Sequence, residues 1–262
     1  MSKIEWTNIT WNPSVGCTKI SPGCLNCYAE KFAKRLQGQG RRGYENGFKL
    51  TLLPERLNEP LRRKTATMYF VDSMSDLFHR DIPDEYIKEV LDIISRAPQH
   101  IFQILTKRAE RMAAYFEGVQ PPRNAWLGVS VEDRKHGIQR IGFLKEIDAT
   151  VRFLSVEPLL EDLGELDLSG LHWVIVGGES GPAARRMEAS WVESLRDQCM
   201  QREIPFFFKQ WGTWAPDGIK RSKAKNGRLL SGREWNEMPI GYSKAVSKCS
   251  TASPPASEDG TA

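Results

Sequence analysis

The segment Met68–Arg96, MYFVDSMSDLFHRDIPDEYIKEVLDIISR, contains the unit from which the fold is inferred. It begins with Met68–Val71, whose apolar, aromatic and β-branched side chains predict a buried strand. It ends with Asp84–Arg96, where apolar residues at i, i+3 and i+4 spacing predict an amphipathic helix. Asp84 follows Pro83 and can start that helix. A strand that leads through a polar loop into a helix is the repeating unit of α/β folds.

The same alternation extends in both directions along the chain. The other predicted strands are Glu5–Trp11, Phe48–Leu52, Ile101–Leu105, Trp126–Val131, Val151–Val156, Trp173–Val176 and Pro205–Lys209. The other predicted helices are Tyr28–Leu36, Pro54–Arg62 (short), Ala109–Phe116, Ile138–Lys145 and Trp191–Arg202. Strands joined by helices pair in parallel, and eight of them in about 210 residues favour a (βα)8 TIM-type barrel. A partial barrel or an open doubly wound sheet is the alternative.

Composition places the chain among ordinary globular proteins. Of its 262 residues, 40% are hydrophobic and 27% are charged, which excludes a fully disordered, collagen-like or coiled-coil chain. No apolar run approaches the roughly 20 residues of a membrane span, and the opening MSKIEWTN is not a secretory signal. We therefore expect a cytoplasmic protein with no membrane partner. In that reducing compartment, clustered cysteines hold a metal or do redox chemistry.

Three regions of different composition follow one another. Residues 1–212 are predicted to form a single barrel domain, and residues 213–242 a basic C-terminal extension. Residues 243–262, rich in Ser, Ala, Pro and Thr, are predicted to be a disordered tail. Of the five cysteines, Cys199 falls in a predicted helix and Cys249 in the predicted tail. The roles of these two are left open.

Positive charge is concentrated in two segments. Residues 30–64 contain ten Lys or Arg and four Asp or Glu. Residues 218–233 contain six Lys or Arg and no Asp or Glu, although the net charge of the whole chain is only +4. Such segments indicate an anionic partner, for example nucleic acid, or simply solvated loops. Trp211 and Trp214, which precede the second segment, are candidates for stacking on a base or for ordinary packing.

Polar residues follow nearly every predicted strand. The carboxyl ends of barrel strands converge on one mouth, where active sites are built. Lys107 and Lys209 are cations that suit a carboxylate or a phosphate. The candidate binding residues at these strand ends are Asp72, Ser73, Lys107, Ser130, Glu157, Gly177, Gly178, Glu179 and Lys209.

Several of these residues have a structural alternative. Asp72 and Ser73 are able to bind ribose hydroxyls or to cap a helix. Glu157, whose backbone is restrained by the following proline, suits a ribose or base edge, or a salt bridge to a barrel lysine. Glu179 suits a ligand or a helix cap. The residue types alone do not decide between these roles.

The segment Gly16–Glu30, GCTKISPGCLNCYAE, is the most distinctive part of the sequence. Cys17, Cys24 and Cys27 have the spacing C-x6-C-x2-C, which lets three thiolates face one ion or cluster. Three thiolates leave one corner of a [4Fe–4S] cluster free. A structural zinc site needs a fourth ligand, for which His79 and His100 are candidates without a telling spacing. Unligated cysteines are the remaining alternative.

A cysteine triad after the first strand of a (βα) barrel resembles the radical S-adenosylmethionine superfamily. In that superfamily a [4Fe–4S] cluster binds S-adenosylmethionine through its open iron and cleaves it to a 5′-deoxyadenosyl radical. The usual spacing there is C-x3-C-x2-C, so the first gap of this sequence is longer. The cysteine pair followed by Tyr28 and Ala29 resembles the spore photoproduct lyase branch, which repairs DNA.

A narrower resemblance covers residues 4–212 and rests on seven ordered motifs. They are WNPxxGCxxxSPGCxNCYAE, FVDSMSDLFH, LTKR, LGVSVE, FLSVEPLL, VGGESG and FFKQWG. Together they look like the phage-associated three-Cys-motif family, whose function is uncharacterised. VGGESG also resembles the GGE motif of the radical superfamily, which there follows the second strand and here follows the seventh predicted one.

These resemblances imply a partial barrel like that of radical S-adenosylmethionine enzymes, a [4Fe–4S] cluster and S-adenosylmethionine. They imply that strand-end residues, Asp72, Ser130, Glu157 and Glu179, position this ligand, with Lys107 or Lys209 on its carboxylate. We expect a nucleic acid or nucleotide substrate, an electron donor if the protein is catalytic, and a partner protein if the site is incomplete without one. The alternative is a non-catalytic nucleic-acid-binding barrel stabilised by zinc or a cluster.

Overall fold

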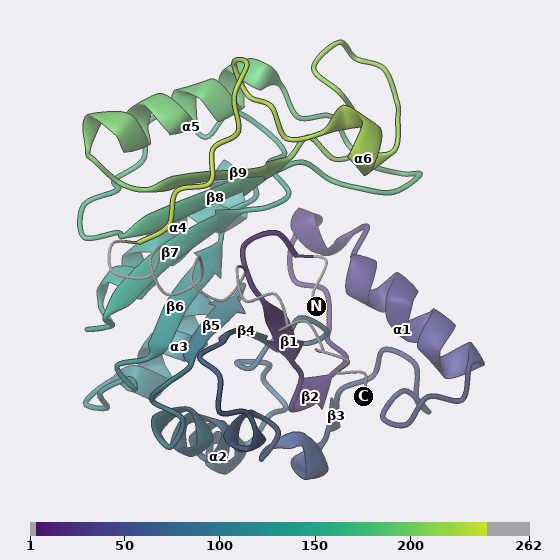
Figure 1. Ribbon diagram of the computed structural model, residues 1–262, viewed down its shortest axis with the longest axis vertical. Helices are drawn as coiled ribbons and strands as arrows, with labels where there is room; N and C mark the ends of the chain where they lie inside the picture. The colour runs from purple at the N-terminus through teal and green to yellow at the C-terminus, as the bar shows by residue number, and fades with distance from the viewer. Residues whose placement is uncertain (1–3, 240–262) are drawn as a thin grey trace, which may run out of the picture.

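The computed structural model describes residues 4–239, and seven parallel strands form its main sheet. In spatial order they are β1 (Ile9–Trp11), β4 (Met68–Val71), β5 (Ile101–Thr106), β6 (Ala125–Ser130), β7 (Val151–Val156), β8 (Trp173–Gly177) and β9 (Phe206–Gln210). The sheet curls into a half-barrel, whose strands follow an arc from β1 to β9 (Figure 1). The predicted α/β class is confirmed, and its form is the partial barrel. The predicted tail and Cys249 lie outside the described residues.

Helices cover the convex face of this sheet. They are α2 (Asp84–Ser95), α3 (Ala109–Phe116), α4 (Arg134–Lys145) and α5 (Ala189–Gln201), while α1 (Tyr28–Gly38) lies apart from them and α6 (Lys223–Asn226) is one turn (Figure 1). Helix α2 begins at Asp84, as predicted. Helix α4 begins before the predicted Ile138 because the Asp133 carboxylate caps it, accepting a bond of 2.6 Å from the backbone N–H of His136. No helix of the described residues is long and apolar enough to cross a membrane.

The prediction of Phe48–Leu52 as a barrel strand was wrong. Only β3 (Thr51–Leu52) forms there, and it pairs antiparallel with β2 (Ser14–Val15) in a separate two-stranded sheet. Strands of a helix-covered parallel sheet are buried on both faces, whereas β3 is only half-buried and follows Lys49. The predicted short helix after it is two 3-10 turns, η2 (Pro54–Arg56) and η3 (Pro60–Arg62).

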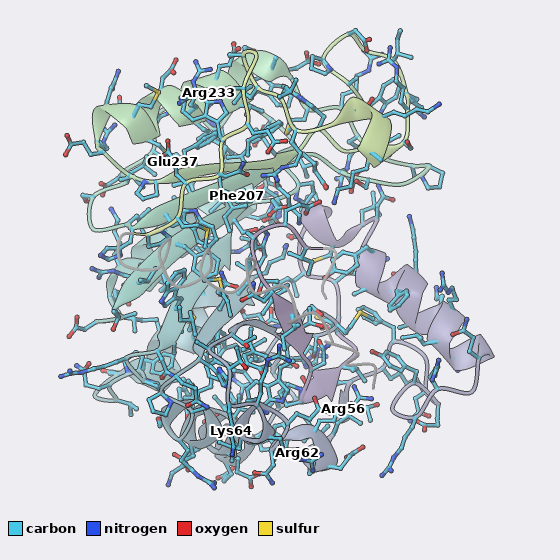
Figure 2. All side chains as sticks on the ribbon, in the orientation of Figure 1. Arg56, Arg62, Lys64, Phe207, Arg233 and Glu237 are labelled. Atoms are coloured by element: carbon cyan, nitrogen blue, oxygen red, sulfur yellow. The ribbon has the colours of Figure 1, made fainter. Side chains whose placement is uncertain are left out.

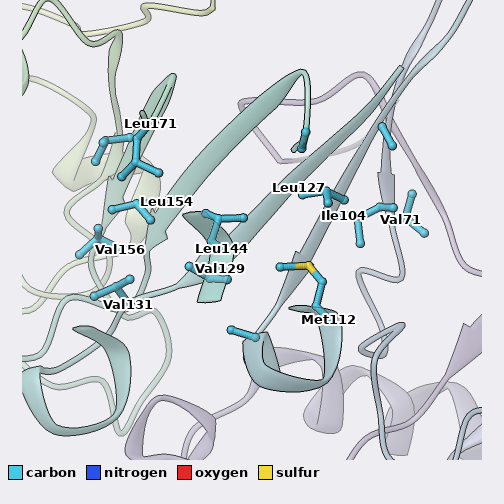
Figure 3. Close-up of a cluster of buried hydrophobic side chains, with 14 of the residues drawn as sticks. Val71, Ile104, Met112, Leu127, Val129, Val131, Leu144, Leu154, Val156 and Leu171 are labelled. Carbon is cyan, nitrogen blue, oxygen red and sulfur yellow. The ribbon is translucent and has the colours of Figure 1, made fainter. Parts of the chain in front are cut away.

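Two apolar cores lie on opposite faces of the sheet, as the two-residue period of strands requires. The convex face packs aliphatic side chains of the strands, such as Leu127 and Leu154, against helices (Figure 3). The concave face carries an aromatic cluster, whose members include Trp6, Phe70, Trp126, Phe153, Trp173 and Phe207. These rings fill the lower interior of the half-barrel. Polar chemistry is therefore restricted to the carboxyl ends of the strands.

The edge of the sheet at β9 is covered by the chain that follows it. The backbone N–H of Phe208 donates to the carbonyl oxygen of Trp235 at 3.0 Å, and that of Glu237 donates to Phe206 at 3.2 Å. Figure 2 shows Phe207, Arg233 and Glu237 together on this side of the molecule. Because an uncovered edge strand invites pairing with other chains, this segment protects the sheet.

We predict that Trp173→Ala lowers the free energy of unfolding by about 3–5 kcal/mol, because it leaves a cavity in a packed aromatic cluster. Trp173 is fully buried, and its ring centroid lies 6.0 Å from those of Trp126 and Phe207. Urea titration measures the effect. Val119→Ala, at a side chain 49% exposed, is the control and should change the value by less than about 0.5 kcal/mol. Equal losses in the two variants would contradict the assignment of this core.

Candidate functional site

The three cysteines of the Gly16–Glu30 segment lie on one compact loop. Cys17 follows β2 by one residue, Cys24 ends the turn η1 (Pro22–Cys24), and Cys27 directly precedes α1. The backbone N–H of Cys24 donates to Ser21 at 3.0 Å, and that of Cys27 donates to Cys24 at 3.3 Å. All three thiols are free and half-buried. We call residues 17–27 the cysteine loop.

The donor set of the loop consists of thiols. Three thiols without a carboxylate among them are the ligand chemistry of iron–sulfur and zinc sites. Within residues 4–239, no three Cys, His, Asp or Glu side chains are grouped around one ion position. The two candidate histidine ligands have other partners: the ring of His79 contacts Thr18 and the N–H of Asp81, and that of His100 contacts Pro60.

The first contact between the loop and the sheet is made by a buried ion pair after β5. The guanidinium of Arg108 lies 2.8 Å from the Asp76 carboxylate, and both side chains are almost fully buried. The same guanidinium donates to the carbonyl oxygen of Thr18 at 3.0 Å and to Cys17 Sγ at 3.5 Å. Burial and the Asp76 charge raise the pKa of Cys17 to about 11, and Arg108 opposes this shift.

The second contact is made after β6. Glu132, which is fully buried, accepts a bond of 2.6 Å from Arg140 of α4 and a short bond from the Ser21 hydroxyl. Ser21 Oγ in turn lies 3.7 Å from Cys24 Sγ. Burial alone would raise the pKa of Glu132, but the charges of Lys107 and Arg140 lower it below its ordinary value. Glu132 is therefore a buried carboxylate that stays ionised.

The third contact is made after β8. The Glu179 carboxylate accepts bonds from the Arg185 guanidinium at 2.7 and 3.0 Å and from the Arg185 backbone N–H at 2.8 Å. It also accepts a bond of 3.1 Å from Asn26, which lies between Cys24 and Cys27. The cysteine loop thus touches three strand ends in turn. It lies across the carboxyl edge of the half-barrel.

Beside this edge, a polar layer lies above the concave aromatic cluster. The two-residue period continues the concave face of β6, β7, β8 and β9 to Ser130, Glu157, Gly177 and Lys209. Glu157 forms an ion pair of 2.7 Å with Lys209, and both side chains are less than a fifth exposed. A Cβ on Gly177 would lie 2.9 Å from Glu157 Oε2, so a larger residue there would shift the Glu157 carboxylate of this pair. These four predicted residues are brought together, and Glu157 takes its predicted alternative, a salt bridge to a barrel lysine.

Two predicted residues serve the loop instead of the polar layer. Both oxygens of the buried Asp72 carboxylate accept bonds from Ser14, from its backbone N–H at 3.0 Å and its hydroxyl at 2.9 Å. The Ser73 hydroxyl donates to Asn12 Oδ1 at 3.1 Å. These bonds join the end of β4 to the segment that leads into Cys17.

The remaining predicted residues lie around the loop contacts. A Cβ on Gly178 would lie 2.1 Å from the carbonyl oxygen of Trp211, so β8 approaches the end of β9 only because this residue is glycine. Lys107 donates its backbone N–H to Asp76 at 3.2 Å. Glu179 is occupied by Arg185 and Asn26.

The two tryptophans named as stacking candidates are engaged in packing. Trp211 is buried, and its indole N–H donates to Leu229 at 2.9 Å. The Trp214 ring has the cations of Arg186 and Lys220 at 4.3 and 4.7 Å from its centroid. Both rings therefore have protein partners already.

Sequence reasoning missed Arg140 and the two loop residues, Ser21 and Asn26, that meet the buried acids. Arg140 has a visible signal: it lies on the buried stripe of α4 with Gly137, Ile141 and Leu144, where a charge needs a partner. Ser21 and Asn26 have the weaker signal of being polar residues between cysteines. Arg108 and Arg185 are cations after predicted strands, which suits them to an anionic ligand, but no regular period pairs them with Asp76 and Glu179.

Parts of the two basic segments lie at separate ends of the molecule. Arg56, Arg62 and Lys64 are at the bottom of Figure 2, and Arg233 is at the top. In the second segment, Arg221 pairs with Asp217 at 2.6 Å, which reduces the charge available to a partner. These four labelled residues therefore do not belong to one continuous patch.

A pocket of about 670 Å³ opens beside the first cysteine. Cys17 lines it together with Lys19, Lys49 and His79. Its apolar wall is formed by the side chains of Phe48, Leu50 and Leu52, which come from the segment around β3. The carboxylates of Glu30 and Asp81 also line it, so the pocket combines a thiol, charges of both signs and an apolar wall.

Comparison with known proteins gives a family and a set of similar folds. Residues 1–239 match a family described as protein of unknown function (DUF5131), and no curated protein matches the sequence. Spore photoproduct lyase complexed with dinucleoside spore photoproduct is similar at 11% identity and a TM-score of 0.41, over 71% of this chain and 58% of that chain. A variant of that lyase with a cysteine replaced by serine is similar at 11% identity and a TM-score of 0.44, over 72% of this chain and 60% of that chain. A variant of the lyase with bound AdoMet and dinucleoside spore photoproduct is similar at 11% identity and a TM-score of 0.41, over 72% of this chain and 60% of that chain. This chain spans less than two thirds of the length of these lyases.

We predict that Asp72 makes the protein less stable as the pH rises from 4 to 8. Burial raises its pKa from 3.8 to about 7, so the folded state binds a proton there that the unfolded state has released. The stabilisation is complete below pH 4 and is lost as the pH rises through 7, and the total loss is on the order of 4 kcal/mol.

The measurement is urea unfolding at several pH values for the native protein and Asp72→Asn. Asparagine keeps the acceptor for the Ser14 N–H and tolerates the positive φ of 54° at this position. The variant should show a flatter pH profile. Parallel profiles would mean that Asp72 does not titrate in this range.

Proposed function

This chain belongs to the family described as protein of unknown function (DUF5131), and we propose from its own site that it is a radical S-adenosylmethionine enzyme. In this proposal Cys17, Cys24 and Cys27 hold a [4Fe–4S] cluster. The substrate is a nucleic acid or a nucleotide, which the enzyme modifies or repairs. The protein works in the reducing cytoplasm, where its thiols stay available.

The observation that carries the proposal is the position of the cysteine loop. Its three thiols lie across the carboxyl edge of a parallel half-barrel, joined to the ends of β5, β6 and β8 by hydrogen bonds. The donor set fits the group, because three thiolates bind three irons and leave the fourth for a ligand. When bound, the cluster would supply the electron that cleaves the sulfonium of S-adenosylmethionine.

The chain's own residues would bind and orient the ligand beside the loop. Lys209 offers an ammonium group to the carboxylate of S-adenosylmethionine, and Glu157 holds that ammonium at 2.7 Å. Ser130 and Ser155, which are partners in the register of β6 and β7, offer hydroxyl groups on the same face. Below them the aromatic cluster excludes water from the site. Glu179 would act on the loop instead of the ligand, since Arg185 and Asn26 occupy it.

Exposed cations support the nucleic-acid part of the proposal. Lys220, Lys225 and Arg233 of the second basic segment are exposed, as is Lys64 of the first. Such cations bind phosphates at positions spread along a polymer. An electron-donor protein is also required for turnover. The pocket beside Cys17, with Lys19 and Lys49 on its rim, is the place we propose for its approach.

We predict that anaerobic reconstitution with iron and sulfide gives a brown protein with about four irons per chain. Reduction in the presence of S-adenosylmethionine should release 5′-deoxyadenosine, measured by liquid chromatography. Cys17→Ala, Cys24→Ala and Cys27→Ala should each lose the visible absorption, because each removes one ligand. Cys199→Ala, in the buried face of α5, is the matched control and should keep it.

A colourless protein that carries one zinc would overturn the enzyme proposal. That result would favour the alternative, a nucleic-acid-binding barrel without turnover. A brown protein that releases no 5′-deoxyadenosine would favour the same alternative with a cluster in place of zinc.

We predict salt-dependent binding to oligonucleotides. Lys64→Gln and Lys225→Gln should each lower the slope of log K against log salt by about one, because each removes one phosphate contact. Fluorescence anisotropy with single- and double-stranded oligonucleotides measures it. Lys145→Gln is the control, since Lys145 is paired with Asp167 at 2.5 Å. Binding that is independent of salt would exclude a polymer and leave a nucleotide as the substrate.

A further inference from the structure

Three carboxylate–arginine pairs, whose acids are all buried, each meet the cysteine loop beside a different cysteine. Arg108 of the Asp76 pair contacts Cys17 and Thr18. The acids of the other two pairs contact Ser21, which neighbours Cys24 in space, and Asn26, which precedes Cys27. We infer that these three pairs are positioning groups, which hold the cysteine loop in one defined conformation at the carboxyl edge of the sheet before any metal is bound. The inference rests on the proposed function only for the identity of the group that the loop receives.

Burial makes the pairs suitable for this role. Glu132 is 0% exposed and Arg140 7% exposed, and the side chains of Asp76 and Glu179 are 8% and 7% exposed. If a buried charge left its partner, it would remain unpaired in the apolar interior, which is strongly destabilising. The donor and acceptor atoms offered to the loop therefore have fixed positions. Each pair is also attached to a strand end or to the loop that directly follows one, which the sheet holds in place.

The loop needs such fixed points because of its length. Six residues separate Cys17 from Cys24, and the turn η1 covers only the last three positions up to Cys24. A free loop of this length samples many conformations, and ordering it opposes ligand binding. Hydrogen bonds from Arg108 at Thr18 and from Ser21 to Glu132 fix the insert at two points. The loop is then ordered by the protein and not by the cofactor.

The first pair differs from the other two in touching a sulfur directly. The Arg108 guanidinium donates to Cys17 Sγ at 3.5 Å, whereas the contacts at Ser21 and Asn26 are made by a hydroxyl and an amide. A positive charge at a ligand sulfur stabilises the reduced, more negative state of a cluster. Arg108 should therefore raise the reduction potential of the cluster, and the Asn26 contact, which reaches no sulfur, should not.

Hydrogen exchange in the metal-free protein tests the preformed loop. The reporters are the backbone amides of Cys24, Leu25 and Cys27, which are bonded within the loop. Ser21→Ala removes the hydrogen bond to Glu132, and Asn26→Ala removes those to Glu179 and to the carbonyl oxygen of Ala183. Both variants leave the ion pairs intact. Each should speed exchange at these amides by about tenfold, the factor for losing one hydrogen bond to a charged group. Ser169→Ala, at a serine that binds Lys145 far along the chain, is the matched control and should change nothing there.

Two results would overturn the inference. One is exchange of these amides in the metal-free native protein at the rate of an unstructured peptide. The other is unchanged exchange in both loop variants. Slow exchange in a protein that takes up no iron supports the preformed loop and refutes the proposed function, so the two failures are distinguishable.

The reduction potential gives a readout that a merely structural role would not move. In the reconstituted protein, Arg108→Gln should lower the midpoint potential, measured by titration followed by electron paramagnetic resonance. Arg108→Lys keeps a cation and should restore part of the shift. Asn26→Ala, which removes no contact to a sulfur, should leave the potential unchanged. Equal potentials for the native protein and both Arg108 variants would refute the role of Arg108 at Cys17.

Discussion

The buried ion pair between Glu132 and Arg140 is the interaction on which the arrangement of the site depends. Arg140 belongs to α4, on the convex side, whereas Glu132 follows β6 and accepts the Ser21 hydroxyl of the cysteine loop. The pair therefore connects the helical layer to the carboxyl edge of the sheet. Loss of either charge would leave the other unpaired in the interior, so helix, strand and loop depend on one another.

Around this pair the half-barrel divides its concave side into two zones. Aromatic rings occupy the lower zone, and Glu157, Lys209 and the serine hydroxyls occupy the upper one. Because the lower zone is solid, a ligand on the concave side would have to lie in the upper zone, next to the cysteine loop. The two glycines at the end of β8 make that zone possible, since a Cβ on either would collide with Glu157 or with the Trp211 backbone.

Much of this arrangement could be predicted from local patterns. The parallel strands were identifiable because they are short, apolar on both faces and followed by helices, and the period of two carries Ser130, Glu157 and Lys209 to one face. The segment around β3 was misassigned because its apolar residues match a strand, although Lys49 and Thr51 exclude burial on both faces. The partners of the cysteine loop were beyond prediction. They come from distant loops, and only the tertiary fold brings Arg185 to Glu179 or Arg108 to Cys17.

The aromatic cluster also has an optical consequence. Trp6, Trp126 and Trp173 are three of the eight tryptophans, and the Trp173 ring centroid lies 6.0–6.2 Å from the other two. Indoles this close exchange excitation energy, so their emission reports on the group as a whole. Trp6 also lies 6.0 Å from the Lys209 ammonium. We therefore expect the tryptophan emission of the protein to change when a molecule binds next to Lys209.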